Sequence, residues 1–262
     1  VRGVARDLAA AGLGKLKPYD LLEPASGGFG SPLEWRRDLP ADRQAACPFV
    51  AGRYFRGVTN RPSPKWLQDR LKAIGLRPIS ALVDITNYVT FDLGRPLHVF
   101  DADKLQGHLT MRFARAGEQI LALDGRTYEL DPETLVIADE AGPQGIGGVM
   151  GGEESGCTEE TKNVFLEVAL FDPIMVVFTG RRLGIQSDAR YRFERGLDPE
   201  SGRWGVDVAT RLILDLCGGE ASETVSAGEI PQEARVVPLR PRRGKDLGGA
   251  PAVTAGNTGF SG

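Results

Sequence analysis

The middle of the chain constrains the fold most, because short strand-like runs alternate with turn residues over 109–138. The dipeptides Asp124-Gly125 and Asp131-Pro132 interrupt these runs, and both are typical of hairpins and turns. A β-meander is therefore predicted there. Further strands are expected at 49–58, at 81–89, where the residues are apolar and β-branched, and at 163–169.

Helical segments surround these strands. A short helix is expected over residues 1–15, stopping at Gly14. A Gly/Pro/Ser-rich stretch from Pro24 to Asp42 is typical of an exposed connector, so a domain boundary is expected there. Three further helices are predicted by caps and periodicity: 63–75, 172–183 and 198–217.

The composition is that of a folded globular protein. Of the 262 residues, 41% are hydrophobic and 26% are charged, which lies outside the range of intrinsic disorder. Lys and Arg number 32 against 35 Asp and Glu, a formal net charge of -3. Binding of nucleic acid by wholesale counterion release is therefore not expected, and any contact with RNA must be local.

The cysteines and the first residues of the chain indicate in which cellular compartment the protein is expected. Cys47, Cys157 and Cys217 are an odd number without Cys-x-x-Cys spacing, which argues against a disulfide framework and a zinc site and fits a reducing cytoplasm. No apolar run approaches the roughly 20 residues that span a bilayer. The first residues lack the apolar core of a signal peptide and the initial Met, so we expect a processed protein or a piece of a longer one.

His98 is the better of two candidates for imidazole chemistry, the other being His108. It follows the polar pair Thr86 and Asn87, which interrupts the predicted strand at 81–89. If strand and loop pack together, a hydroxyl, an amide and an imidazole converge on one spot. The spacing alone also allows the alternative that His98 is a half-buried histidine whose hydrogen bonds are made within the protein. Asn87 would then be a residue that forms a turn.

Glu167 is the one charge within the apolar run 164–170. Burying a carboxylate is costly unless it is paired or hydrogen-bonded. A strand with one face in solvent would explain the residue simply. The alternative is a carboxylate that lines a pocket and accepts a hydrogen bond from a hydroxyl or amine of a ligand.

The glycine-rich segment 145–156 lets the backbone approach another group closely. It is not a phosphate loop: GxxxxGK[ST] is absent, and Met150 occupies the third glycine position of GxGxxG. We favour a pocket wall of bare backbone, with a tight turn as the alternative. Since GxSxG and HExxH are also absent, a hydrolytic site would have to activate water with positioned polar groups.

Five arginines with interleaved aromatic residues lie between 181 and 195. Arginine and aromatic side chains can stack on bases and grip phosphates. More often such a run is a solvated face whose arginines are ion-paired, here with Asp188, Glu194 and Asp198.

Four blocks within 47–220 closely resemble the β subunit of bacterial phenylalanyl-tRNA synthetases, in that family's order and spacing. These blocks are 77–89 with 93–101, 147–156, Leu166-Glu167, and 187–199. The resemblance implies an α+β fold, a B3/B4-type module of mixed sheet and helices. It also implies that 1–35 is the end of a B1-like domain, that 36–46 and 221–234 are linkers, that 47–220 is the editing module, and that 235–249 starts a B5-like domain. A Gly-rich tail at 250–262 is expected to be disordered.

The resemblance further implies a site that edits by hydrolysing mischarged Tyr-tRNA(Phe). In the family's pattern a carboxylate accepts a hydrogen bond from the tyrosine phenol, and small residues leave room for the ring. The family often has Thr where Ser187 stands, and the exchange keeps the hydroxyl. The residues implied to surround the ester and the attacking water are Thr86, Asn87 and His98, and those implied to bind the substrate are Glu167, Gly151, Ser187 and Ala189.

The expected partners also follow from the resemblance. They are an α subunit, in an α2β2 heterotetramer, and tRNA(Phe), with no membrane contact and a cytoplasmic location. Activation of Phe, with ATP and Mg2+, is expected in the α subunit, and no cofactor or metal is expected in this chain. The alternative is a noncatalytic scaffold that holds the α subunit and tRNA. A freestanding module that edits in trans is less compatible with the flanking B1-like and B5-like pieces.

Overall fold

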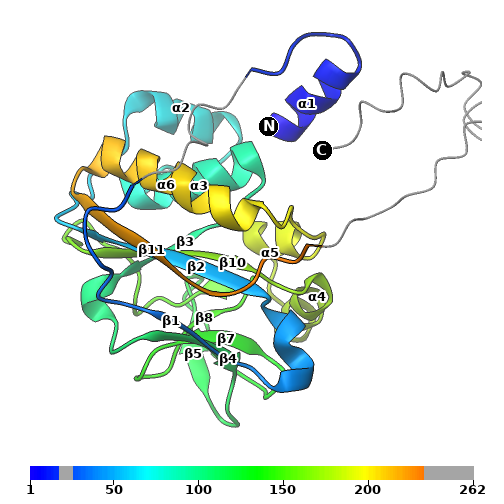
Figure 1. Cartoon of the computed structure of the whole chain (residues 1–262), viewed down its shortest axis with the longest axis vertical. Helices are drawn as coiled ribbons and strands as arrows, with labels where there is room; N and C mark the ends of the chain where they lie inside the picture. The colour runs from blue at the N-terminus through cyan, green and yellow to red at the C-terminus, as the bar shows by residue number, and fades with distance from the viewer. Residues whose placement is uncertain (18–25, 233–262) are drawn as a thin grey trace, which may run out of the picture. The chain divides into compact units, whose positions relative to one another are not determined.

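The computed structural model describes residues 1–17 and 26–232 (Figure 1). The chain divides into two compact units, one made of Val1–Pro18 and Gln232–Gly262 and the other of Tyr19–Pro231. In the described part of the first unit, helix α1 spans Arg2–Ala10. It is shorter than the helix expected over 1–15, and none of its residues is buried.

A four-stranded sheet lies at the centre of the second unit, in the order β11-β2-β10-β3. Every neighbouring pair in it is antiparallel. The strands are β2 (Phe49–Arg56), β3 (His98–Asp101), β10 (Val164–Leu170) and β11 (Glu220–Gly228).

A second sheet has the strand order β1-β4-β7-β8-β9. Strand β1 pairs parallel with β4, and the other pairs are antiparallel. The hairpin β5–β6 forms a separate two-stranded sheet. The strands are β1 (Trp35–Asp38), β4 (Leu109–Phe113), β5 (Gln119–Leu121), β6 (Thr127–Glu129), β7 (Leu135–Ala138), β8 (Pro143–Ile146) and β9 (Met150–Gly151).

Helices α3 and α6 cover the outer face of the four-stranded sheet, and the second sheet lies on its other side (Figure 1). Helix α4 begins where the Asp172 carboxylate accepts a hydrogen bond from the Ile174 N–H, and Pro173 occupies the first turn. The helices are α2 (Lys65–Ala73), α3 (Ala81–Leu93), α4 (Pro173–Arg182), α5 (Asp188–Phe193) and α6 (Ser201–Cys217), with short 3-10 helices at Ala41–Ala46 and Ala102–Lys104. This combination of sheets and helices confirms the predicted α+β fold.

Strand β10 is buried along its whole length, so both of its faces are packed. Leu166 and Val168 belong to the core formed with the helices, whereas Phe165 and Ala169 belong to the core between the two sheets. Because alternate residues of a strand share a face, Glu167 lies on the inter-sheet side with Phe165 and Ala169. A solvent-exposed strand face therefore does not explain Glu167.

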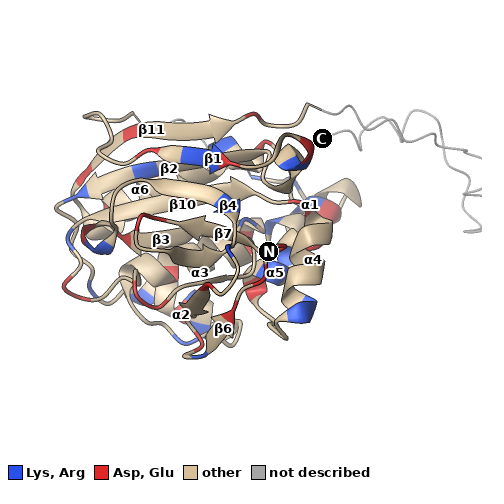
Figure 2. Cartoon of the chain, turned by 90° about the horizontal axis from the view of Figure 1, so that it is seen from below, with Lys and Arg blue, Asp and Glu red and all other residues tan. Residues whose placement is uncertain are grey.

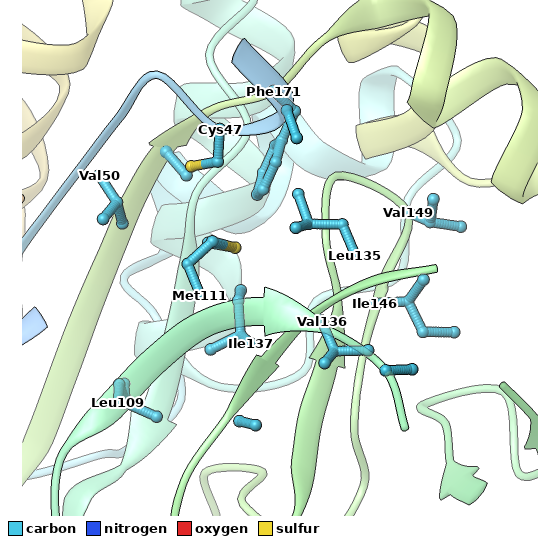
Figure 3. Close-up of a cluster of buried hydrophobic side chains, with 14 of the residues drawn as sticks. Cys47, Val50, Leu109, Met111, Leu135, Val136, Ile137, Ile146, Val149 and Phe171 are labelled. Atoms are coloured by element: carbon cyan, nitrogen blue, oxygen red, sulfur yellow. The ribbon is translucent and has the colours of Figure 1, made fainter. Parts of the chain in front are cut away.

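The inter-sheet core is apolar and includes residues from both sheets (Figure 3). Val50 belongs to β2 of the four-stranded sheet, and Leu109, Met111 and Ile137 belong to the second sheet. Phe171 follows β10 and is packed in the same cluster. A buried carboxylate on this side of β10 consequently has apolar neighbours, which raises the free energy of its charged form.

The prediction of a strand at 81–89 is wrong, because these residues form most of helix α3. Ala81, Ile85 and Val89 recur at helical spacing and are buried in the core with α6, so tertiary packing outweighs the strand propensity of their β-branched side chains. Gly94 ends the helix with φ of 76°, a left-handed conformation that glycine adopts most readily.

Two segments predicted to be linkers contain strands. Residues 36–46 hold most of β1 and a 3-10 helix, and Trp35 at the start of β1 packs against Phe165, with ring centroids 5.7 Å apart. Residues 221–228 continue β11, which pairs with β2, and 233–234 lie outside the described residues. The two strands are ordered because their backbones complete the edges of the sheets.

The strands of the predicted β-meander at 109–138 exist, but they do not all pair with their neighbours in the sequence. The Asp124-Gly125 turn does join the hairpin β5–β6, but β4 pairs with β7 rather than with β5. The predicted strands at 49–58 and 163–169 correspond to β2 and β10, and the helix predicted over 198–217 corresponds to α6.

Some expectations fall beyond the described residues. The B5-like start at 235–249 and the tail at 250–262 lie outside them. The assignment of 1–35 to a B1-like domain stays a prediction. Among the described helices, none combines the length and the apolar character that a membrane span requires.

Candidate functional site

Glu167 and His98 lie directly opposite each other, on the neighbouring strands β10 and β3. Opposed residues of an antiparallel pair project from the same face of the sheet. Both side chains line one cavity of about 70 Å³ between the two sheets. A water molecule needs about 10–15 Å³ on this measure, so the cavity holds roughly five water-sized positions, a space on the scale of one aromatic ring.

The carboxylate of Glu167 is only 7% exposed and accepts no hydrogen bond from the described residues. Burial raises its pKa from 4.5 to about 7, and the positive charge of Arg95 partly opposes this rise. The carboxylate is thus a buried acceptor whose hydrogen-bonding capacity is left for a ligand.

Arg95 is the positively charged residue that lowers the pKa of Glu167, and it was not predicted as a site residue. It is 1% exposed, and its Nη2 donates a hydrogen bond to the Ala169 carbonyl oxygen at 2.6 Å. Its guanidinium carbon lies 5.7 Å from the centroid of the Phe193 ring, and Phe193 lines the cavity. Desolvation lowers the pKa of Arg95 to about 10, so the group stays charged at neutral pH. Arg95 stands behind the cavity wall and supports the ionised form of Glu167.

His98 brings a neutral imidazole into the cavity. Burial alone lowers its pKa to about 4, and its Nε2 has no hydrogen-bond partner among the described residues. The edge of its ring contacts Phe100, with centroids 4.4 Å apart, which fixes the plane of the imidazole. A neutral histidine with a free ring nitrogen can take up a proton or hydrogen-bond a water molecule.

Bare backbone forms the opposite wall of the cavity. Gly145, Gly148 and Gly151 line it, from strands β8 and β9 and the turn between them. A Cβ atom at Gly151 would collide with the imidazole of His98, and one at Gly148 would press on Val176 and Phe171. The glycine-rich segment is therefore the pocket wall that we favoured from the sequence, and the lack of side chains keeps the cavity open.

The rest of the lining is apolar. Ile137, Ile146, Val149 and Phe171 appear together in Figure 3 as members of the inter-sheet core, and all four line the cavity. Sequence analysis did not single out these residues, because apolar side chains of a cavity and of an ordinary core look alike in a sequence. They make the cavity suited to a ring that carries one polar group.

The short helix α5 contributes two predicted residues in different ways. Ala189 lines the cavity. The hydroxyl of Ser187 caps α5 by accepting a hydrogen bond from the Arg190 N–H, and it donates one to the Val149 carbonyl oxygen at 2.5 Å. Ser187 thus holds α5 against the cavity wall and lines a separate, open groove outside it.

Thr86 and Asn87 lie on helix α3 and are not among the residues that line the cavity. The Thr86 hydroxyl donates to the Val83 carbonyl oxygen at 2.8 Å, a local bond within the helix. One turn later, the Thr90 carbonyl oxygen accepts a hydrogen bond from Nε of Arg192 at 2.9 Å, which joins α3 to α5. The structure therefore brings Glu167, His98, Gly151 and Ala189 together and places Thr86 and Asn87 on a neighbouring helix.

Four of the five arginines in the segment are ion-paired. Arg182 pairs with Asp131, Arg190 and Arg195 with Glu194, and Arg192 with Asp188, so Asp131 is a partner in place of the expected Asp198. Basic and acidic residues alternate over the described elements instead of forming a stripe of one sign (Figure 2). This favours the ion-paired face among the two sequence-based alternatives for 181–195.

No group of three or more His, Cys, Asp or Glu side chains within 1–17 and 26–232 is arranged to hold a metal ion. The chemistry available in the cavity is that of a buried carboxylate and a neutral imidazole that line one apolar space of about 70 Å³. Such a site can bind a ring with a hydroxyl group and orient water against a bond at its mouth.

The model of the family described as "B3/4 domain" matches residues 46–218. The chain is 61% identical to the phenylalanine--tRNA ligase beta subunit of Rhodospirillum rubrum and 56% identical to that of Paramagnetospirillum magneticum, over 95% and 97% of this chain. It spans about a third of the length of those relatives, 31% and 32%. A crystal structure of an N-terminal fragment of the Pyrococcus horikoshii phenylalanyl-tRNA synthetase beta subunit resembles 97% of this chain and 69% of the fragment, with 14% identity and a TM-score of 0.44.

Proposed function

The chain belongs to the B3/4 domain family, and on that premise we propose that its cavity is an editing site that hydrolyses tyrosine from mischarged Tyr-tRNA(Phe). The chain would act as part of the β subunit of a phenylalanine–tRNA ligase, the protein named for its relatives. The observation that carries the proposal is the unpaired, buried Glu167 carboxylate in an apolar cavity beside the His98 imidazole.

The need for such a site follows from the chemistry of the two amino acids. Tyrosine differs from phenylalanine by one hydroxyl, and an apolar synthetic pocket rejects a ligand with an added hydroxyl only weakly. A site built to hydrogen-bond that hydroxyl discriminates strongly in the opposite direction, because the ligand that lacks it leaves a buried polar group unpaired.

Glu167 supplies this selection. The phenol O–H of tyrosine would donate to the carboxylate, which has no other hydrogen-bond partner in the described residues. A phenylalanine ring would fill the same space and exclude water while leaving the carboxylate unpaired, at a cost of about 1–3 kcal/mol. This corresponds to a preference for tyrosine of roughly 5- to 150-fold.

His98 and the glycine wall would position the reacting ester. Burial lowers the pKa of the imidazole to about 4, so it is neutral at physiological pH and a weak base. It would orient the attacking water through Nε2, which has no partner among the described residues. Gly151 has no Cβ, so its backbone packs directly against the imidazole and holds the ring in place at the cavity wall. Thr86 and Asn87 on α3 would complete the polar surroundings of the ester from outside the cavity lining.

The partners of the full assembly belong to the same proposal. An α subunit would activate Phe with ATP and Mg2+ and transfer it to tRNA(Phe), in an α2β2 assembly in the cytoplasm. This chain would contribute proofreading. The alternative function, a noncatalytic scaffold for the α subunit and tRNA, leaves the unpaired carboxylate without a role.

Deacylation of Tyr-tRNA(Phe) tests the proposal. We expect the wild-type chain to release tyrosine well above the uncatalysed rate and Glu167→Ala to be at least tenfold slower, because the phenol loses its acceptor. Glu153→Ala, at an exposed position, is the matched control and should behave as wild type. Equal background rates for wild type and Glu167→Ala would favour the scaffold.

A further inference from the structure

A second hollow lies outside the cavity, along helix α5. It is an open groove of about 430 Å³, far larger than the cavity of about 70 Å³. Its lining is polar and aromatic instead of apolar: Gln186, Ser187, Asp188, Arg190, Tyr191 and Glu194.

The groove and the cavity share helix α5 as a common wall. Ala189 lines the cavity, whereas its neighbours Asp188 and Arg190 line the groove. Ser187, also in the groove, donates its hydrogen bond to the carbonyl of Val149, which lines the cavity. The cavity and the groove therefore adjoin the same short helix, each with different residues of it in its lining.

Tyr191 offers an aromatic surface in the groove. Tyr191 is 57% exposed, and the guanidinium carbon of Arg195 lies 3.6 Å from the centroid of the Tyr191 ring. Arg195 is held there by hydrogen bonds to the Tyr191 carbonyl oxygen at 2.6 Å and to the Glu194 carboxylate at 2.7 Å. An exposed ring backed by a fixed guanidinium is a surface on which a planar base stacks well.

The charges of the groove favour a nucleoside over a phosphate. Arg190 is paired with Glu194 within the groove, and Arg192 nearby is paired with Asp188. The Asp188 side chain is 57% exposed, and Arg192 contacts only its Oδ1. Its other oxygen can accept a hydrogen bond from a ribose hydroxyl, while the ion pairs of Arg190 and Arg192 already engage the guanidinium groups that would bind a phosphate.

We propose that this groove binds the terminal nucleoside of the tRNA, the one that carries the tyrosyl ester, with its base stacked on Tyr191 and a ribose hydroxyl donating to Asp188. The inference rests on the proposed editing function and assigns the half of the substrate that the cavity is too small to hold. The ester would then lie at the boundary formed by α5, between the two hollows.

The test measures binding without hydrolysis, by calorimetry. The ligands are 3′-tyrosylamino-3′-deoxyadenosine, whose amide resists hydrolysis, and tyrosinamide, which lacks the nucleoside. The wild-type chain should bind the adenosine conjugate about tenfold or more tightly than tyrosinamide. Tyr191→Ala should lose most of this advantage and leave the affinity for tyrosinamide near that of wild type, whereas Tyr191→Phe should keep the advantage because the ring remains.

Two further variants sharpen the experiment. Asp188→Asn should lower the affinity for the adenosine conjugate several-fold and leave the affinity for tyrosinamide unchanged. Phe178→Ala, an equally exposed aromatic residue on α4 outside both hollows, is the matched control and should bind both ligands as wild type does. The nucleoside proposal is overturned if wild type binds the two ligands equally or if Tyr191→Ala keeps the full advantage.

The outcome separates this inference from the proposed function. Binding of tyrosinamide that depends on Glu167, with no higher affinity for the adenosine conjugate, would mean that the groove does not bind the nucleoside. The proposed role of the cavity in binding tyrosine would be unaffected. If neither ligand binds wild type in a Glu167-dependent way, the editing proposal and the inference that rests on it both fail.

Discussion

The carboxyl group of Glu167 and the imidazole of His98 face the same cavity from directly opposed positions on β10 and β3, and neither has its hydrogen bonds satisfied by the described residues. Buried polar groups in folded proteins are nearly always paired, so two such groups in one cavity indicate a site kept ready for a ligand. The apolar residues around them determine the electrostatics of both groups. Burial raises the pKa of the acid and lowers that of the base.

Glu167→Gln should change how the free energy of unfolding depends on pH. The pKa of Glu167 is 4.5 in its ordinary state and about 7 in the folded chain, so its contribution to stability is complete below pH 4.5 and is lost as the pH rises to about 7. The glutamine variant does not titrate there. Its stability relative to wild type should therefore increase with pH across this window, by at most roughly 1.4 kcal/mol per pH unit.

Urea denaturation of both proteins at several pH values between 4.5 and 7 measures that difference. The other titrating groups are present in both proteins, so the difference isolates Glu167. A difference that stays flat or decreases with pH contradicts a raised pKa in the folded state.

Gly151→Ala should disable the site by displacing His98. The new Cβ would collide with the imidazole, and such overpacking typically costs about 1–3 kcal/mol of stability. Deacylation of Tyr-tRNA(Phe) should fall together with the melting temperature. Gly30→Ala is the matched control, because no atom lies within 4 Å of a Cβ there. Full activity in Gly151→Ala would show that the position of His98 is unimportant.

Arg95→Met should raise the pKa of Glu167 further, because Arg95 is the one charge in the described part of the chain that lowers this pKa. The midpoint in the pH dependence of tyrosinamide binding should move to higher pH, and Arg95→Lys, which keeps a positive charge, should shift it less. Calorimetric titration from pH 5 to 9 gives these midpoints. An unchanged midpoint in Arg95→Met would mean that the guanidinium does not support the ionised carboxylate.

The cysteines should resist alkylation in the native protein. Burial raises the pKa of Cys47 and Cys157 to about 12 and that of Cys217 to about 11, and only the thiolate is an effective nucleophile. Iodoacetamide at pH 8 should modify all three in urea and almost none in buffer, as measured by intact mass. Rapid modification of Cys47 in the native chain would contradict its burial.

The central residue of the site could be read from the sequence, because a single charge in the apolar run of β10 requires a specific explanation. Its structural partner Arg95 could not, since nothing in a sequence shows that two distant segments place opposite charges near one another. The helix at 81–93 was misread as a strand because its β-branched side chains favour strands locally, whereas packing against α6 decides the structure.

The segments at 36–46 and 221–234 were misread for a similar reason. The resemblance implied linkers there, whereas residues 36–38 and 221–228 pair with strands far away in the chain. The grouping of Glu167, His98, Gly151 and Ala189 came from the family resemblance, and the structure places these four around one cavity. The catalytic roles of Thr86, Asn87 and His98 stay predictions, as do the substrate-binding roles of the other four predicted site residues.

The most direct test of the account is whether the chain binds a tyrosine ligand more tightly than the corresponding phenylalanine ligand. Calorimetry with tyrosinamide and phenylalaninamide should show that wild type binds the tyrosine compound at least tenfold more tightly, about 1.4 kcal/mol, and that Glu167→Ala binds the two alike. If Glu167→Ala keeps the preference of wild type, or if wild type has none, the buried carboxylate does not select the phenol.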